Sequence, residues 1–280
     1  MLNKKELTSI FENIAKKKAL KVTRTRLGHS SVTYKINTDD KNTYYFKQGK
    51  NNYKLQYELS ELLRSNDINT PEILSFDNEW IIEKGIVGNR LNITSKGLSK
   101  HILFQLGKTL SKLHSIKTVG YGELASIEVG VHKRYTEYYS KIINLIHDKY
   151  KKEIVEYINK DHATYLNHGD ICPNHIYVNS QGEYVAIIDW DDVVSAPIEF
   201  DLSELMLNIN NNEEYWNSFM DGYSITGQYV HSHNRDLLLA ELLQATEGLY
   251  YHLIETKDDN DIDRTKRTKI KMIEKMIDNT

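Results

Sequence analysis

Apolar residues at helical spacing predict amphipathic helices at the start of the chain and over residues 53–65. Between them, residues 20–36 and 43–48 are rich in β-branched and aromatic residues, as strands are. A further buried strand is predicted over residues 79–84. The helical positions are Leu7, Ile10, Phe11 and Ile14 in the first helix, and Leu55, Leu59, Leu62 and Leu63 in the second. The first 85 or so residues are therefore expected to form a small antiparallel sheet that carries one inserted helix.

Helical patterns dominate after Gly85–Gly88. A helix is predicted over about 99–115, and a long helical region over about 134–160. Two short strands, near 175–178 and 184–189, interrupt the helices. The fold class is therefore α+β. It divides into an N-terminal domain of residues 1–84 and a larger, mainly helical domain of residues 85–280.

Composition narrows the function classes. The 280 residues carry a formal net charge of −3, which gives no support for nucleic acid as a partner. The single cysteine, Cys172, excludes an internal disulfide and fits a reducing compartment. No stretch approaches the ~20 apolar residues that a membrane helix needs. The sequence thus predicts a cytoplasmic protein without a membrane partner.

Two carboxylates mark the most informative part of the chain. Asp170 precedes a loop and the first strand of a predicted hairpin, and Asp189 ends the returning strand. A hairpin returns the chain to its starting point, so both carboxylates are expected to face one cleft. Phosphoryl transfer uses such a pair, one to orient the attacking hydroxyl and accept its proton, the other to hold Mg²⁺ against the phosphates.

The segments LNHGDICPNHIYV and IIDWDD resemble those of the aminoglycoside phosphotransferase family, whose fold is that of protein kinases and which is related to choline kinase-type enzymes. The resemblance implies two lobes with the active site between them. It implies a kinase that transfers the terminal phosphoryl group of ATP or GTP, with Mg²⁺, to a hydroxyl of a small molecule. By the same match, Asp170 is the catalytic base and Asp189 the main metal ligand.

The resemblance extends to the N-terminal domain. Lys47 stands where the family has its phosphate-binding lysine, and Glu58 where a glutamate pairs with that lysine. A buried ammonium needs such a carboxylate partner. The loop containing Ser30 and Ser31 resembles the family's nucleotide-positioning loop. Residues 81–88 fall at the hinge that receives the adenine, so Lys84 and Ile86 are expected to contact the base through their main chains.

Position 175 departs from the family pattern. The family usually has Asn there as a second metal ligand, whereas this chain has His175 and places Asn174 one residue earlier. An imidazole is a softer ligand than Mg²⁺ usually takes. Either His175 replaces the asparagine, or a shifted loop brings in Asn174, or the second metal is weakly held. On register alone, His175 is the preferred ligand.

Several neighbouring residues have structural interpretations. His168 is expected to hold the catalytic loop through hydrogen bonds, and His114 to be a satisfied packing residue. Asp201 and Glu204 form a D-x-x-E capping box, which predicts a helix beginning at Asp201. Asp191 could contact metal or a cationic substrate.

The acceptor pocket is expected near residues 199–206 and 236–255, where acidic side chains favour an amine-bearing substrate such as an aminoglycoside. These acids are Asp236, Glu241, Glu247 and Glu255. Two other functions stay open. A metal-dependent hydrolase could use the His and Asp residues as ligands, and a pseudokinase could bind nucleotide without turnover.

Overall fold

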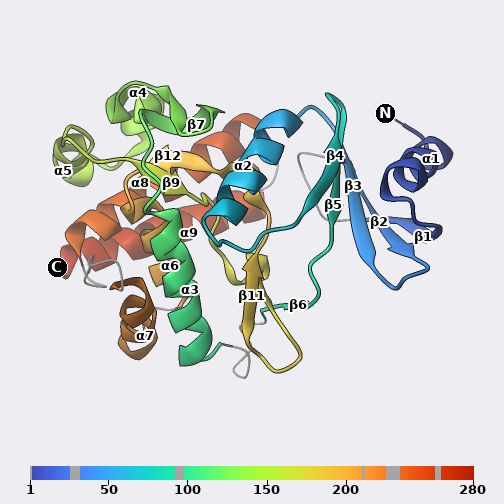
Figure 1. Ribbon diagram of the computed structural model, residues 1–280. Coiled ribbons are helices and arrows are strands. Elements are labelled where there is room, and N and C mark those ends of the chain that lie inside the picture. Colours follow the sequence, from blue (N-terminus) through green and yellow to red (C-terminus); the bar gives the residue numbers. More distant parts are fainter. Residues whose placement is uncertain (1, 26–31, 92–97, 210–211, 225–233, 256–259) are drawn as a thin grey trace. The chain divides into compact units, whose positions relative to one another are not determined.

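The computed structural model describes residues 2–25, 32–91, 98–209, 212–224, 234–255 and 260–280. The chain forms two compact units (Figure 1). The first comprises residues 1–91 together with 174–191, and the second comprises residues 92–173 and 192–280. The first unit is therefore made of two separate stretches of the chain, because residues 174–191 belong to it as well. Whether these units coincide with the functional lobes expected from the sequence stays a prediction.

The first unit is built on a five-stranded antiparallel sheet in the order β1-β2-β3-β5-β4. The sequence predicted a small antiparallel sheet here, without the strand order. Helix α2, Tyr53–Ser65, lies between β3 and β4 in the chain. The strands are β1 (Ala19–Arg24), β2 (Val32–Thr38), β3 (Thr43–Gln48), β4 (Ile73–Phe76) and β5 (Trp80–Lys84). Strand β4 has no clear alternation and was not predicted.

One face of this sheet is covered by α1, Lys4–Ala15. Leu7 and Phe11 of α1 are fully buried and pack against Phe46 of β3 and Ile82 of β5. Burying such side chains contributes roughly 1.5–3 kcal/mol each. Because side chains alternate along a strand, Lys47 and Glu83 point to the opposite face. The sheet thus separates a closed apolar core from a face that carries charge.

A second, three-stranded sheet completes the first unit in the order β11-β10-β6. Its strands are β6 (Asn89–Arg90), β10 (Ile176–Val178) and β11 (Tyr184–Ile187), and both pairings are antiparallel. The β10–β11 hairpin agrees with the prediction. Its register pairs Ile176 with Ile187, so His175 and Asp189 lie next to each other just beyond the paired strands.

The second unit combines helices with a four-stranded sheet in the order β8-β7-β12-β9. Its strands are β7 (Tyr121–Ser126), β8 (Val129–His132), β9 (Tyr165–Asn167) and β12 (Val194–Ala196). None of these was predicted. The helical region expected over about 134–160 consists of three separate pieces, α4 (Tyr135–Tyr139), the short 3-10 turn Ile143–Leu145 and α5 (Asp148–Ile158).

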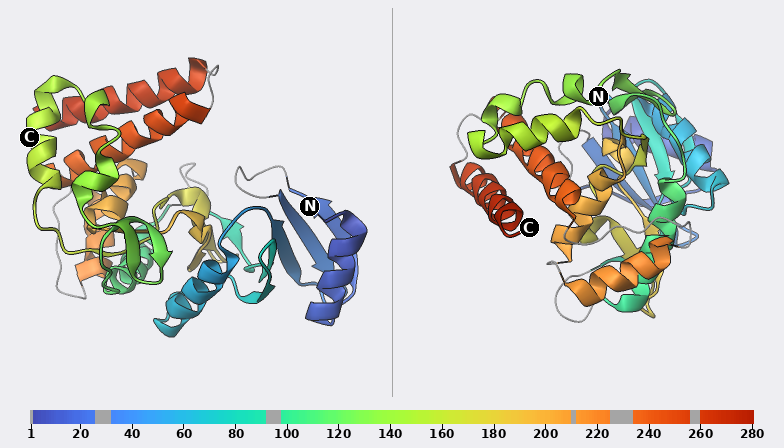
Figure 2. Two further views of the ribbon diagram at one scale, coloured as in Figure 1. Left: turned by 90° about the horizontal axis from the view of Figure 1, so that it is seen from above. Right: turned by 90° about the vertical axis from the view of Figure 1, so that its left-hand side faces the viewer.

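The remaining helices of the second unit are α3 (Lys100–Leu113), α6 (Glu199–Asn208), α7 (Glu213–Tyr223), α8 (Arg235–Glu255) and α9 (Asn260–Asp278). Helices α3 and α7 pack closely, since a side-chain carbon at Gly107 or Gly222 would collide with the backbone of the facing helix. Helix α9 runs alongside α8 (Figure 2). Within the described residues, no helix combines the length and the apolar character that spanning a membrane requires.

Candidate active site

Lys47 forms a buried ion pair with Glu83 in the first unit. In the sheet register Lys47 is opposite Ile81 and Glu83 is opposite Tyr45, which makes Lys47 and Glu83 diagonal neighbours on one face. The Lys47 Nζ lies 3.2 Å from Glu83 Oε1. The side chain of Lys47 is 15% exposed and that of Glu83 is 14% exposed. The strand pairing itself therefore brings this lysine and its carboxylate together.

Asp191 supplies a second carboxylate to the same lysine. It belongs to the short 3-10 turn Trp190–Asp192 that follows β11, and its Oδ1 lies 3.8 Å from Lys47 Nζ. The same oxygen accepts a 2.8 Å hydrogen bond from Nε2 of Gln56 on α2. The cluster thus joins β3, β5, α2 and the segment after β11 within one unit.

The cluster contains more negative than positive charge. Burial lowers the pKa of Lys47, but the charges of Glu83, Asp191 and Asp189 raise it on balance, so the ammonium stays charged. Burial, with the charges of Asp191 and Asp189, raises the pKa of Glu83 against the opposing effect of Lys47. Among the described residues, the carboxylates of Glu83 and Asp191 thus share the Lys47 ammonium, and the charge of Asp189 adds to theirs. Such an excess suits a bound cation.

Asp189 lies at the end of β11 in an unusual backbone conformation. Its φ is +67°, in the left-handed region that few residues other than glycine adopt. His175 Nε2 lies 3.4 Å from Asp189 Oδ2, and the His175 carbonyl accepts a 2.9 Å hydrogen bond from the Ile188 amide. The Asp189 side chain is 45% exposed, whereas His175 is 12% exposed. The structure thus places the two expected metal ligands, Asp189 and His175, side by side.

In the second unit, Asp201 holds the backbone of the H-G-D segment. Its Oδ2 accepts a 2.7 Å hydrogen bond from the His168 amide, and its Oδ1 accepts a 2.9 Å bond from the Gly169 amide. Gly169 has a φ of +86°, and a side-chain carbon there would collide with the Asp192 carbonyl. Only glycine therefore fits at this position. The segment before Asp170 is thus held in place through hydrogen bonds from its main-chain amides to Asp201.

Buried side chains support Asp201 from behind. His114 Nε2 lies 3.1 Å from Asp201 Oδ2, and His114 Nδ1 lies 2.8 Å from the Tyr223 hydroxyl. This network is consistent with the tautomer in which Nε2 donates to the carboxylate and Nδ1 accepts from Tyr223. Burial raises the pKa of Asp201, but the hydrogen bonds that it accepts from His114 and from the Gly169 amide lower it on balance. His114 is thus a satisfied buried residue, as expected.

The loop immediately after Gly169 is held in the same way. The Asp170 amide donates a 3.2 Å hydrogen bond to His168 Nδ1, so His168 holds the loop as the sequence predicted. The Ile171 amide donates a 3.0 Å hydrogen bond to Glu204 Oε2. Burial, with the charges of Asp170 and Glu241, raises the pKa of Glu204 to about 8.

The predicted capping box at Asp201 and Glu204 is wrong. Helix α6 begins at Glu199, so Asp201 lies inside its first turn and is fully buried. Instead of capping their own helix, the two carboxylates accept hydrogen bonds from the amides of residues 168, 169 and 171. The carboxylates of a D-x-x-E pattern can accept hydrogen bonds from the amides of their own helix or from those of another segment. The tertiary fold decides which amides they bind.

The expected pairing of Glu58 with Lys47 is also wrong in this structure. Glu58 forms an ion pair with Lys54 at 3.6 Å on the exposed side of α2, and its side chain is 43% exposed. Gln56, two residues earlier, faces the Lys47 cluster instead. The bounds of the helix were predicted correctly. The prediction of which side chain faces Lys47 was wrong, because the helix is rotated differently about its axis. Glu83 was missed, although strand alternation in WIIEK places it on the Lys47 face.

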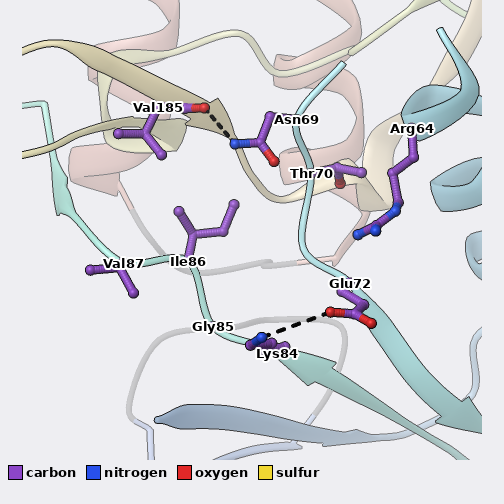
Figure 3. A pocket seen from close by; sticks show the side chains of 9 residues that line it. All are labelled: Arg64, Asn69, Thr70, Glu72, Lys84, Gly85, Ile86, Val87 and Val185. Atoms are coloured by element: carbon purple, nitrogen blue, oxygen red, sulfur yellow. Dashed lines mark hydrogen bonds and ion pairs between the residues drawn. The ribbon is translucent and has the colours of Figure 1, made fainter. Parts of the chain in front are cut away.

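Lys84 and Ile86, which were expected to contact the base, line a pocket of about 270 Å³ within the first unit (Figure 3). The Lys84 side chain points toward Glu72 at 4.0 Å, on the face of β5 opposite to that of Glu83. The Lys84 amide already donates to the Glu72 carbonyl, so a base contact through Lys84 would need its carbonyl oxygen. The other residues of the pocket are Arg64, Asn69, Thr70, Glu72, Gly85, Val87 and Val185.

Two further predictions concern the serine loop and the two aspartates. Ser30 and Ser31 lie outside the described residues. Asp170 belongs to the second unit and Asp189 to the first. Their meeting in one cleft stays a prediction.

Comparison with known proteins agrees with the kinase-like class that these features define. The sequence pattern of the phosphotransferase enzyme family (APH) matches residues 21–238. This chain therefore belongs to the phosphotransferase enzyme family, and it is a small-molecule kinase by class. No curated protein matches it.

Solved structures show the same fold at low sequence identity. A thermostable mutant of the aminoglycoside phosphotransferase APH(4)-Ia is 13% identical with a TM-score of 0.72, covering 94% of this chain and 96% of its own. Spectinomycin phosphotransferase APH(9)-Ia is 14% identical with a TM-score of 0.67, covering 99% and 98%. The macrolide 2'-phosphotransferase MphH from Brachybacterium faecium is 13% identical with a TM-score of 0.66, covering 95% and 96%.

Proposed function

We propose that this protein transfers the terminal phosphoryl group of ATP or GTP to a hydroxyl of a small molecule, with Asp170 as the catalytic base. The observation that carries the proposal is the buried Lys47 ammonium, which is surrounded by more carboxylates than it neutralises. A phosphate-binding lysine needs this support, because a lone buried ammonium would be costly. The reaction uses cytoplasmic nucleotide, so the proposal places the protein in the cytoplasm.

The residues of each unit have distinct roles in the proposed reaction. Lys47 binds phosphate oxygens of the nucleotide, and Glu83 and Asp191 keep its ammonium in place. The main chain of residues 84–86 contacts the base. Asp170 accepts the proton of the attacking hydroxyl, a contribution worth ~10²–10⁴-fold in rate. Asp201 and Glu204 fix the loop that carries Asp170, so that this carboxylate is oriented before the acceptor binds.

The carboxylates of the first unit fit Mg²⁺, which prefers oxygen ligands. Asp189 would hold it, because its carboxylate is accessible and lies beside the negatively charged Lys47 cluster. His175, whose Nε2 lies 3.4 Å from Asp189 Oδ2, would be the second ligand. When bound, Mg²⁺ would neutralise charge that develops on the phosphates.

The acceptor is proposed to be an alcohol, with an aminoglycoside or another amine-bearing compound as the leading class. The structure of APH(9)-Ia holds ADP and spectinomycin, which illustrates a nucleotide with an antibiotic acceptor in a similar fold. In this chain, however, three of the four acids expected to favour an amine already have partners. Asp236 pairs with Lys160, Glu241 with Lys269, and Glu247 accepts from the Tyr138 hydroxyl.

The decisive experiment is an ADP- and GDP-release screen with Mg²⁺ against aminoglycosides, amino alcohols, choline and sugars. Asp170→Asn should lower kcat for any stimulating acceptor by ~10²–10⁴-fold, while calorimetry shows that nucleotide still binds. Asp161→Asn, an exposed aspartate of the same unit, is the matched control and should keep full turnover.

Two outcomes would contradict this function. Nucleotide binding without acceptor-stimulated release by any compound in the screen would favour a nucleotide-binding pseudokinase. If neither ATP nor GTP raised the melting temperature in the presence of Mg²⁺, a metal-dependent hydrolase would become the better description.

A further inference from the structure

Helix α9 brings a lysine to the acids that lie behind the Asp170 loop. Lys269 Nζ is 2.7 Å from Oε1 of Glu241, whose side chain is 1% exposed. Burial raises the pKa of Glu241, and the charge and hydrogen bond of Lys269, with a hydrogen bond from Ser203 of α6, oppose that effect. A buried carboxylate in this state needs a positive charge nearby. Lys269 supplies it.

This ion pair belongs to a larger acid cluster around the loop. Glu241 of α8 faces α6, where Gln244 donates to the Ser203 hydroxyl, one residue before Glu204. Glu204 in turn accepts from the Ile171 amide, the residue after Asp170. The charges of Glu241, Glu204 and Asp170 all act on the Lys269 ammonium. The Lys269 ammonium is thus already paired with one acid of this cluster, Glu241.

We propose that Lys269 determines acceptor specificity by taking the place that a substrate ammonium would otherwise occupy beside the Asp170 loop. The acceptor then presents an uncharged, hydroxyl-bearing part to this region, and any amine it carries lies elsewhere. The specificity role rests on the proposed phosphoryl transfer. The cation site itself can be tested without turnover.

The first test is chemical rescue of Lys269→Ala in the 280-residue chain. This substitution removes the ammonium and leaves the Glu241 carboxylate unpaired, so the melting temperature should fall. Ethylammonium chloride should then raise the melting temperature of the variant by about 2 °C or more above the effect of sodium chloride at equal ionic strength. The wild type and Lys271→Ala, an exposed lysine two residues away on the same helix, should show no such difference.

A double variant guards against a folding defect. Lys269→Ala combined with Glu241→Gln leaves no buried unpaired charge, so it should fold and should not respond to ethylammonium. An equal response of Lys269→Ala and the double variant would overturn the proposal, because Glu241 would not be the group that binds the cation. So would the absence of any response in Lys269→Ala.

The second test compares D-glucosamine with D-glucose, which differ by one amine in place of a hydroxyl, in ADP release. Wild type should not prefer glucosamine. Lys269→Ala should shift the ratio of kcat/KM values toward glucosamine by about tenfold, the equivalent of 1.4 kcal/mol. An unchanged ratio would overturn the specificity role. If no alcohol stimulated release in the wild type, the proposed function would fail, and the rescue test would still decide whether Lys269 occupies a cation site.

Discussion

The Lys47 cluster and the Asp201 clamp use buried carboxylates in opposite ways. Around Lys47, Glu83 and Asp191 bind a side-chain ammonium, and the carboxylates outnumber it. Around Asp201, the carboxylate accepts from backbone amides and from a buried histidine, and its oxygens are satisfied. The Lys47 cluster can therefore exchange its bound ions, whereas the contacts of Asp201 stay fixed.

This difference teaches which acids in such a protein serve binding and which serve positioning. Side-chain ion pairs with excess charge can accept a cation or release a lysine to phosphate without disturbing the fold. A carboxylate that holds main-chain amides cannot change partners without moving the loop. Substitutions in the two regions should therefore fail in different ways.

The largest effect should come from Asp201→Asn. The amide side chain keeps the size but offers one acceptor oxygen where the carboxylate uses two, so a backbone amide of the loop loses its partner. Unfolding free energy should fall by about 3–5 kcal/mol, measured by urea denaturation. Asp161→Asn should stay within about 0.5 kcal/mol of the wild type. A loss below ~1 kcal/mol for Asp201→Asn would show that the clamp is not structural.

Lys47→Met should mainly affect catalysis. The methionine keeps the bulk of the side chain but removes the ammonium that would bind phosphate. We expect kcat/KM for the nucleotide to fall by ~10²–10³-fold, with steady-state ADP release as the measurement. If turnover were lost only because the protein unfolds, circular dichroism would show it, and the distinction between the two regions would collapse.

Glu204→Gln should change the pH dependence of stability. Burial, with the charges of Asp170 and Glu241, raises the pKa of Glu204 to about 8 from its ordinary 4.5. The folded protein therefore holds this proton more tightly than the unfolded chain, and stability falls as the pH rises from about 4.5 to about 8. Glu204→Gln should flatten this decline in thermal melts. An equally steep decline in the variant would remove Glu204 from the account.

The smallest effect should be that of Glu58→Gln. Glu58 is exposed and paired with Lys54 on the helix surface, so its loss should change stability by less than ~0.5 kcal/mol. Turnover should stay within about twofold of the wild type, since such a surface pair contributes little. Glu83→Gln, which removes the actual partner of Lys47, is the contrasting variant and should be clearly impaired. Equal impairment by both would restore the expected role of Glu58.

Much of the first unit could be predicted because its signals are local. Residues 43–48 and 53–65 were predicted with their observed bounds, since alternation and helical spacing depend only on neighbouring residues. The strands of the second unit are short and poorly patterned, such as Val194–Ala196, which is buried throughout. Their pairing depends on strands that are distant in the sequence, so no local pattern of apolar residues predicts it.

The sequence by itself determined the family, the kinase-like class and the residue types for the chemistry, because motifs such as H-G-D are carried by neighbouring residues. Only the tertiary structure decided that Lys47 pairs with Glu83, that Asp201 and Glu204 hold the Asp170 loop, and that Lys269 meets Glu241. Those partners are far apart in the chain. Which face of a helix or strand meets which neighbour is fixed by packing, and sequence spacing does not record it.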